Sequence, residues 1–160
     1  MPENFSISIS IIMPTLNEAA TLPHALSSLS GENVEVEILV VDCGSSDETQ
    51  NLASEAGARL LISPLRQRAA QMNMGARAAT GEILLFLHAD TRLPAHALQK
   101  INSCMANTKT VGGAFCRRFD YPSLFLKFTC LLADLRLCLF GWCFGDQGIF
   151  VRKSIFEELG

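Results

Sequence analysis

Short apolar runs alternate along this chain with segments of helical spacing. Such runs are typical of strands that are buried on both faces and therefore need no polar alternation. We predict strands at 6–13, 34–41, 58–62, 82–87, 111–119 and 148–152. Proline cannot donate to a central ladder, so Pro14 is expected to end the first strand.

The segments between these runs carry apolar residues three and four positions apart, which is the spacing of a helix face. A first helix is expected around Leu22 to Leu29, and a second from the 43–48 turn to Gly57, with Ser45 and Glu48 at capping-box spacing. Further helices are predicted at 67–79, 94–105, 124–140 and 153–159. This order predicts one α/β domain with a mostly parallel sheet and helices on both faces.

Composition narrows the class of protein. Of the 160 residues, 49% are hydrophobic and 18% charged, which favours a folded core over disorder. The net charge of −3 argues against nucleic acid as a partner. The six cysteines form no CxxC and no zinc-site spacing, and we find no signal-peptide pattern, so we expect reduced thiols and a cytoplasmic protein.

The stretch 124–144 is strongly apolar but contains Lys127, Asp134 and Arg136. Charges at its centre make a membrane-spanning helix expensive, so a core-facing or interfacial helix is expected. Its Phe and Leu content leaves a peripheral contact with the inner face of a membrane open.

Two of the apolar runs end in a carboxylate. Asp42 follows the run 38–41, and Asp90 follows the run 84–87 with only His88 and Ala89 between. Open α/β sheets bind ligands at the carboxyl ends of their strands, so two acids at this edge suggest a nucleotide and metal site. The alternative is that each Asp caps the helix that follows it.

The first turn after a strand, 14–18, has no GxGxxG fingerprint, which makes a dehydrogenase a poor interpretation. It offers instead an amide and a carboxylate that suit a ribose and a base edge. On these residues alone, a simple turn with Asn17 or Thr21 as a helix cap remains open.

Three motifs in order carry a resemblance to a known family: MPTLNE at 13–18, VVDCGSSD at 40–47 and GEILLFLHAD at 81–90. Together they resemble the nucleotide-sugar half of the family 2 glycosyltransferases, which have the GT-A fold. Two further runs, RQRAAQMNMGA at 66–76 and GDQGIFVR at 145–152, are similar to the small bacterial subgroup assigned to arsenosugar biosynthesis.

The resemblance implies a role for particular residues. It places base and ribose contacts at Thr15, Glu18 and Asp42, and a carboxylate suits their N–H and O–H donors. The nucleotide-sugar site that it implies comprises Pro14, Thr15, Glu18, Asp42, Arg68, Asn73, His88 and Ala89. A structural alternative for Arg68 is a solvated helix face.

Asp90 matches the last acid of the family's Asp-x-Asp motif, which binds a divalent metal on the diphosphate. The first acid of that motif is replaced here by His88. One carboxylate with diphosphate oxygens suits Mg²⁺, whereas an imidazole ligand would favour Mn²⁺. His88 has an alternative role as a hydrogen-bond partner of the ribose or a phosphate.

An inverting transferase, which the resemblance implies, also needs a base to deprotonate the acceptor hydroxyl. Asp146 is the candidate within the chain, with acceptor binding or loop bracing as its alternative roles. The family usually carries its base after a Gly-Gly-Phe-like turn, which we expect beyond Gly160. We therefore expect a single domain with a nucleotide-sugar half at 1–91 and an incomplete acceptor side at 92–160.

The leading interpretation is a metal-assisted, inverting glycosyltransferase that takes a sugar from a nucleotide-diphosphate donor, predicted to be UDP-linked, to an unidentified acceptor. A truncated, non-catalytic nucleotide-sugar binding protein is the first alternative. A nucleotidyltransferase is the second, although the turn 14–18 lacks the glycine-rich, basic loop which that class favours.

Overall fold

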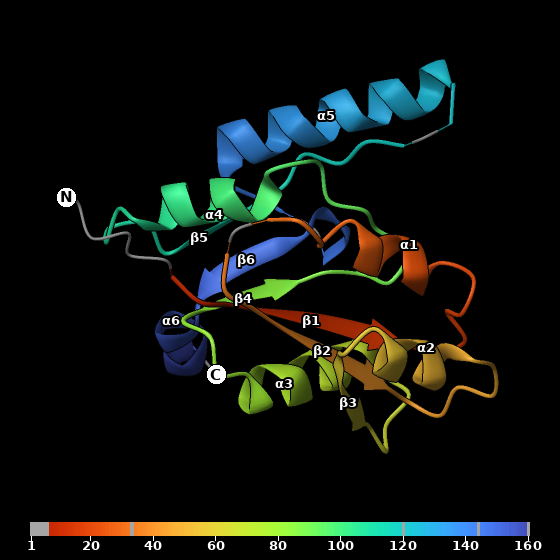
Figure 1. Cartoon of the computed structure of the whole chain (residues 1–160). Coiled ribbons are helices and arrows are strands. Elements are labelled where there is room, and N and C mark those ends of the chain that lie inside the picture. Colours follow the sequence, from red (N-terminus) through yellow and green to blue (C-terminus); the bar gives the residue numbers. More distant parts are fainter. Residues whose placement is uncertain (1–6, 33, 120, 144, 160) are drawn as a thin grey trace.

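A computed structural model describes residues 7–32, 34–119, 121–143 and 145–159. Its elements form three layers, with a six-stranded sheet between two layers of helices. The strand order is β3-β2-β1-β4-β6-β5 (Figure 1). The strands are β1 Ile9–Thr15, β2 Val36–Asp42, β3 Arg59–Ile62, β4 Ile83–Phe86, β5 Gly112–Ala114 and β6 Ile149–Arg152. The first four strands are parallel, and β6 runs antiparallel to both β4 and β5. The predicted α/β class with a mostly parallel sheet is confirmed.

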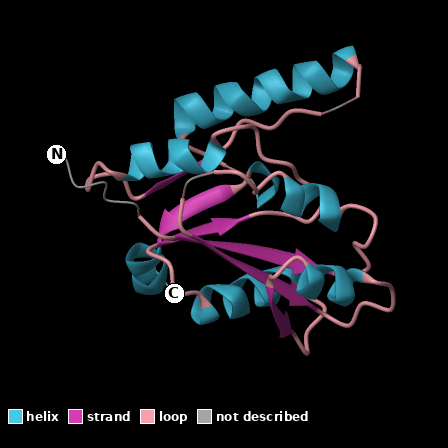
Figure 2. Ribbon diagram, viewed as in Figure 1, coloured by secondary structure: helices cyan, strands magenta, loops and turns pink. Residues whose placement is uncertain are grey.

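Helices cover both faces of the sheet, as the layers in Figure 2 show. The helices are α1 Leu22–Ser27, α2 Thr49–Glu55, α3 Arg68–Ala78, α4 Ala97–Met105, α5 Leu124–Phe140 and α6 Lys153–Leu159, with a short 3-10 turn, η1, at Gly145–Gln147. Side chains of α1, α2 and α4 pack on one face of the sheet, and side chains of α3 and α6 on the other.

Alternate residues of β1 point into the two cores because side chains alternate along a strand. Ile11 and Met13 face the core under α1 and α4, and Ile12 faces the core under α3. Helix α3 lies very close to the sheet at Gly75, where a Cβ atom would meet Ile12 Cγ2 at 2.4 Å. Any larger residue at this position would push α3 away from the sheet.

The expected end of the first strand at Pro14 is wrong, because β1 continues through Pro14 to Thr15. The carbonyl of Ile12 accepts the Leu87 amide, so Pro14, two residues later, also turns its backbone nitrogen toward the β4 side. Strand β4 ends at Phe86, opposite Ile12. The proline therefore faces no ladder partner on that side and costs no hydrogen bond.

Other details also differ from the prediction, among them the start of α4 at Ala97 where a helix from 94 was expected. Strand β5 covers three residues of the expected 111–119, because it is an edge strand that pairs only with β6. The capping box is also absent: Glu48 is the N-cap of α2 without a side-chain cap, and Ser45 donates its hydroxyl to Asp42 instead.

Helix α5 lies outside the three layers, beyond α4 and far from the central strands (Figure 1). Of its side chains that the structure describes, only Cys130 and Ala133 are buried. Within the described residues, no helix is long and apolar enough to cross a membrane.

Candidate functional site

The site lies where the chain reverses direction across the sheet. From β1 the chain builds β2 and β3 on one side, and then returns to place β4 on the other side of β1. The loops after β1 and β4 therefore leave neighbouring strands at the same edge. Such a switch point is where open α/β sheets form their ligand crevice.

The loops after β1 and β2 are joined by direct hydrogen bonds. The Asn17 amide donates to Ser45 Oγ at 2.8 Å, and Asn17 Oδ1 accepts the Ser46 amide at 2.8 Å. The Glu18 amide donates to Thr49 Oγ1 at 2.8 Å. Asn17 holds a left-handed conformation (φ 57°), which asparagine tolerates better than most residues. The two loops form one structural unit, which the sequence interpretation missed.

Asp42 is fully buried at the centre of this unit. Its Oδ1 accepts the Gly44 and Ser45 amides, both at 2.9 Å, and Gln50 Nε2 at 2.7 Å. Its Oδ2 accepts the hydroxyls of Thr15, at 3.1 Å, and Ser45. Burial raises the pKa of Asp42, but hydrogen bonds from Ser45, Gln50 and Gly44 outweigh it and lower the pKa below its usual value. The carboxylate is thus held ionised inside the loop.

A second buried polar residue, Gln71 of α3, was not anticipated. Its Nε2 donates to the carbonyl of Thr15 at 2.9 Å and to that of Val41 at 2.6 Å. It thereby ties α3 to the carboxyl ends of β1 and β2. A glutamine within an Ala- and Met-rich helix face is the signal that could have found it.

The predicted nucleotide-sugar residues of this first half fall into two groups. Pro14, Thr15 and Asp42 are buried, so they shape the loops from within. Glu18 is half-buried and accepts the Thr21 hydroxyl at 2.7 Å, whereas Arg68 and Asn73 lie exposed on α3. Arg66 reaches the same loops, with Nη2 3.8 Å from the Cβ position that Gly44 lacks.

The loop after β4 forms the second half of the site. A turn closes it, with the Thr91 amide donating to the carbonyl of His88 at 3.0 Å. This turn buries Ala89, leaves His88 half-buried and exposes Asp90. Asp90 Oδ1 accepts the Thr91 hydroxyl at 3.2 Å.

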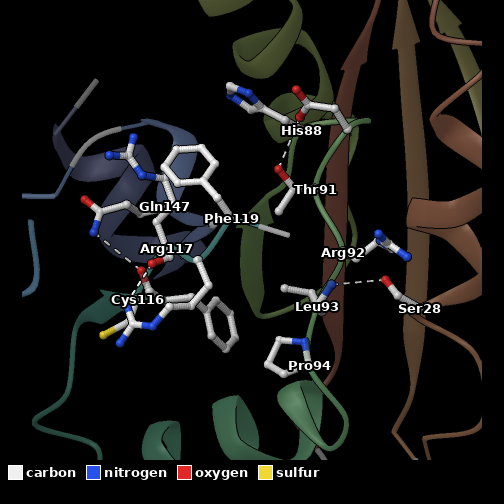
Figure 3. A pocket seen from close by; sticks show the side chains of 14 residues that line it. Ser28, His88, Thr91, Arg92, Leu93, Pro94, Cys116, Arg117, Phe119 and Gln147 are labelled. Carbon is white, nitrogen blue, oxygen red and sulfur yellow. Dashed lines mark hydrogen bonds between the residues drawn. The ribbon is translucent and has the colours of Figure 1, made fainter. Parts of the chain in front are cut away.

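A cavity of about 680 Å³ opens beside this turn, and Figure 3 shows its walls. One wall is the segment after β4, with His88, Asp90 and Arg92; the other follows β5, with Arg117 and Phe119. The guanidinium of Arg117 stacks over the Phe119 ring, 4.8 Å from its centroid. Thr15, Glu18 and Asp42 are not among the lining residues, so the cavity extends the site away from the β1–β2 loops.

The 3-10 turn η1 closes the cavity from a third side through the buried Gln147. The backbone carbonyl of Gln147 accepts the Phe115 amide at 2.8 Å, which fixes η1 against the wall after β5. Asp146 belongs to η1, but its side chain lies outside the described residues.

A divalent metal is compatible with Asp90 in its chemistry. Asp90 offers an exposed, hard oxygen ligand at the cavity wall, with His88 two residues before it. Across the described residues, no group of three or more His, Cys, Asp or Glu side chains is placed to hold a metal. A metal here would take most of its ligands from a diphosphate and water, as Mg²⁺ often does.

Comparisons of the sequence with a family model and with known proteins agree on one class of protein, the glycosyltransferases. A family model described as glycosyl transferase family 2 matches residues 10–133. A PGL/p-HBAD biosynthesis glycosyltransferase from Mycobacterium bovis is 33% identical over 165 residues, covering 94% of this chain and 61% of that protein. A 4,4'-diaponeurosporenoate glycosyltransferase from Staphylococcus haemolyticus is 35% identical over 102 residues, 59% of this chain and 27% of that protein. The chain thus spans less than two thirds of either relative.

Solved structures share the fold. The mannosyltransferase PcManGT from Pyrobaculum calidifontis, in complex with GDP-Man and Mn²⁺, matches with a TM-score of 0.77 at 23% identity over 98% of this chain and 48% of its own. Glucosyl-3-phosphoglycerate synthase from Mycobacterium tuberculosis, in complex with Mn²⁺, UDP and glucosyl-3-phosphoglycerate, matches with a TM-score of 0.66 at 20% identity, covering 93% of this chain and 58% of its own. The GT-A-like α/β fold predicted from the sequence is confirmed.

Proposed function

The chain belongs to glycosyl transferase family 2, and we propose that it transfers a sugar from a UDP-linked donor to a hydroxyl of an acceptor, with inversion. The observation that carries this proposal is the pairing of β1 with β4. This pairing brings the loop 14–18, which is predicted to contact the nucleotide, and Asp90 to one edge of the sheet. The UDP and GDP-mannose complexes of the structural neighbours support a nucleotide-sugar donor.

In this proposal the joined loops after β1 and β2 hold the nucleoside. Glu18 and Asp42 accept hydrogen bonds from the base or ribose, and Arg68 and Asn73 contact the nucleotide from α3. Asp42 is already saturated by protein donors, so a nucleoside contact requires one of them, such as the Ser45 hydroxyl, to turn away. Pro14, Thr15 and Ala89 contribute backbone shape.

Asp90 is proposed to hold the divalent metal, with His88 as a further ligand or as a partner of the ribose or a phosphate. When bound, the metal neutralises the charge that develops on the diphosphate leaving group. The Mn²⁺ complexes of both structural neighbours support a divalent metal. The exposed position of Asp90 leaves room for diphosphate oxygens beside its carboxylate.

Asp146 is proposed as the base that takes the proton from the acceptor hydroxyl. Its turn, η1, borders the cavity through Gln147 and Gly148, so the acceptor is expected to enter this cavity. The assignment to arsenosugar biosynthesis stays a prediction, carried by the motifs at 66–76 and 145–152. A cytoplasmic location likewise stays a prediction.

The test has two stages with the 160-residue chain. Calorimetric titrations with UDP and GDP, each with and without Mn²⁺, should show metal-dependent binding that favours UDP. Release of UDP from UDP-glucose then separates an enzyme from a non-catalytic binding protein. Donor binding without turnover would favour the binding protein, and binding of neither nucleotide would contradict the whole proposal.

A further inference from the structure

Helix α5 presents a continuous apolar face that the described residues of the chain leave uncovered. Leu124, Phe128, Leu131, Leu135 and Leu139 follow each other at three- and four-residue spacing and are all exposed. Leu131 is 63% exposed, although its neighbour Cys130 is buried. Exposed apolar patches of this extent are typical of a binding surface.

Amphipathic aromatic residues lie at both ends of this face. Tyr121 precedes α5 and is 71% exposed, and Trp142 follows it and is 66% exposed. Tyrosine and tryptophan carry an apolar ring with a polar tip, which suits the boundary between lipid and water. A helix flanked in this way is suited to lie in the plane of a bilayer surface.

The charges around α5 indicate which kind of partner would bind to its exposed face. The segment 107–143 holds five basic and two acidic residues, although the whole chain carries a net charge of −3. Lys127 is exposed between the apolar residues of the helix. Asp134 is turned inward, with its Oδ2 2.9 Å from Arg118 Nη2. The described face thus offers a cation and no exposed acid, which complements an anionic lipid surface.

A groove beside α5 adjoins the cavity of the site. The groove is a hollow of about 390 Å³, and its lining combines five apolar or aromatic side chains with Lys127 and the Arg118–Asp134 ion pair; the five are Phe119, Tyr121, Leu126, Cys130 and Leu131. Arg118 and Phe119 line both this hollow and the cavity that contains Asp90. An apolar chain in the groove would therefore place its polar end in the cavity.

The end of α5 is tied to the same cavity. Arg136 donates through Nε to the carbonyl of Trp142 at 3.2 Å, and through Nη2 to Gln147 Oε1 at 3.4 Å. Gln147 lines the cavity and follows Asp146 directly. A surface that holds α5 would consequently hold the cavity at a fixed height above it.

We propose that the exposed face of α5 docks the protein on an anionic lipid bilayer, and that the groove beside it admits the apolar part of an amphipathic acceptor from that bilayer. The docking step stands on the α5 surface alone. The acceptor step rests on the proposed glycosyltransferase function.

Trp142 gives a direct readout, because it is the single tryptophan of the chain. Vesicles of phosphatidylcholine with phosphatidylglycerol should shift its emission to shorter wavelength and shield it from acrylamide. Vesicles of phosphatidylcholine alone should bind more weakly, and added salt should weaken binding to the anionic vesicles. Lys127→Glu should reduce the preference for anionic vesicles.

Leu131→Glu removes an exposed apolar side chain, so it should lower vesicle affinity roughly tenfold. Leu65→Glu is the matched control, because Leu65 is 53% exposed next to β3, at the opposite edge of the sheet from β5. That variant should bind vesicles like the unaltered chain. Circular dichroism of both variants checks that the fold is kept.

Two results would overturn the proposal. One is vesicle binding that Leu131→Glu leaves unchanged. The other is a dimer in sedimentation equilibrium that Leu131→Glu dissociates, with no binding to vesicles, because a second copy would then be the occupant. UDP titration of the same sample separates either result from a failure of the proposed function.

The acceptor step has its own test. Below its micellar concentration, n-dodecyl-β-maltoside should stimulate UDP release from UDP-glucose more than maltose does. Equal effects of the two compounds would overturn the acceptor step.

Discussion

Replacing Asp42 by alanine should lower both stability and nucleotide affinity, for reasons that can be separated. The carboxylate is fully buried and accepts hydrogen bonds from the Gly44 and Ser45 amides, from Gln50, and from the hydroxyls of Thr15 and Ser45. Alanine would leave these donors in the loop without their acceptor. The loop between β2 and α2 would then lose its defined shape.

The magnitude follows from the kind of donor that is lost. Hydrogen bonds to a charged group contribute about 1.5–3 kcal/mol each, but the two hydroxyls can turn to other acceptors and water can reach the loop. Counting the two amides and discounting the rest gives a loss of about 3 kcal/mol. For a chain of this size that corresponds to a fall in Tm of about 6–12 °C.

The pH dependence supplies an independent check. Because hydrogen bonds hold the pKa of Asp42 below its usual value, this group stabilises the fold above its unfolded pKa, near 3.9. That stabilisation is lost as the pH falls through the lower, folded pKa. The Tm difference between the unaltered chain and Asp42→Asn should therefore be largest at neutral pH and shrink below about pH 4.

Scanning calorimetry measures the stability change, and titration with uridine and with UDP measures binding. Asp42→Ala should weaken the binding of uridine and of UDP equally, because the base or ribose is the expected contact. Glu48→Ala on the exposed neighbouring surface is the control and should shift Tm by less than about 2 °C. An unchanged Tm in Asp42→Ala would refute the hydrogen-bond reasoning. Normal uridine affinity in a folded Asp42→Asn would refute the nucleoside contact.

Three further substitutions test other parts of the site. Asp90→Asn should weaken UDP binding in the presence of Mn²⁺ by roughly tenfold while sparing metal-free UDP binding and Tm; equal losses with and without Mn²⁺ in a calorimetric titration would contradict the metal role. Gln71→Leu removes the side-chain donor that two buried carbonyls share, although that of Thr15 still accepts the Cys43 amide at 3.2 Å, so urea unfolding should show a loss of about 0.5–1.5 kcal/mol; no loss would show that the side-chain amide does not stabilise the fold. Asp146→Asn should lower UDP release from UDP-glucose by about 10²–10⁴ with unchanged UDP affinity; an unaltered rate would remove it as the base.

The sheet could be predicted because its strands are buried on both faces, and burial leaves a plain signal in the sequence. The runs ending at Asp42 and Asp90 became β2 and β4, each within two residues of the expected bounds at their carboxyl ends. Boundaries that depend on neighbouring strands could not be predicted in this way. Pro14 stays in β1 only because β4 ends opposite Ile12, and this depends on a pairing between distant segments.

The position of two acids at strand ends could be predicted from the sequence, but their local environments could not. The bonds from Asn17 to Ser45 and from Glu18 to Thr49 join residues about thirty positions apart, and no spacing rule within one loop reveals them. Gln71 is similar, because its two carbonyl acceptors belong to two different strands. Long-range polar contacts of this kind follow from the packing of the loops.

The two strand-end acids show how the following residues decide what a carboxylate does. After Asp42, the turn through Gly44 directs the Gly44 and Ser45 amides back at the carboxylate. The carboxylate is therefore hydrogen-bonded within the loop, and its lowered pKa keeps it ionised. After Asp90, the turn is closed by the carbonyl of His88, and no described backbone amide points at the carboxylate. The same sequence pattern, an apolar run followed by Asp, therefore yields a buried carboxylate that organises one loop and an exposed carboxylate in the other. Of the two acids, only Asp90 could bind a metal without first losing a hydrogen bond that a backbone amide donates to it.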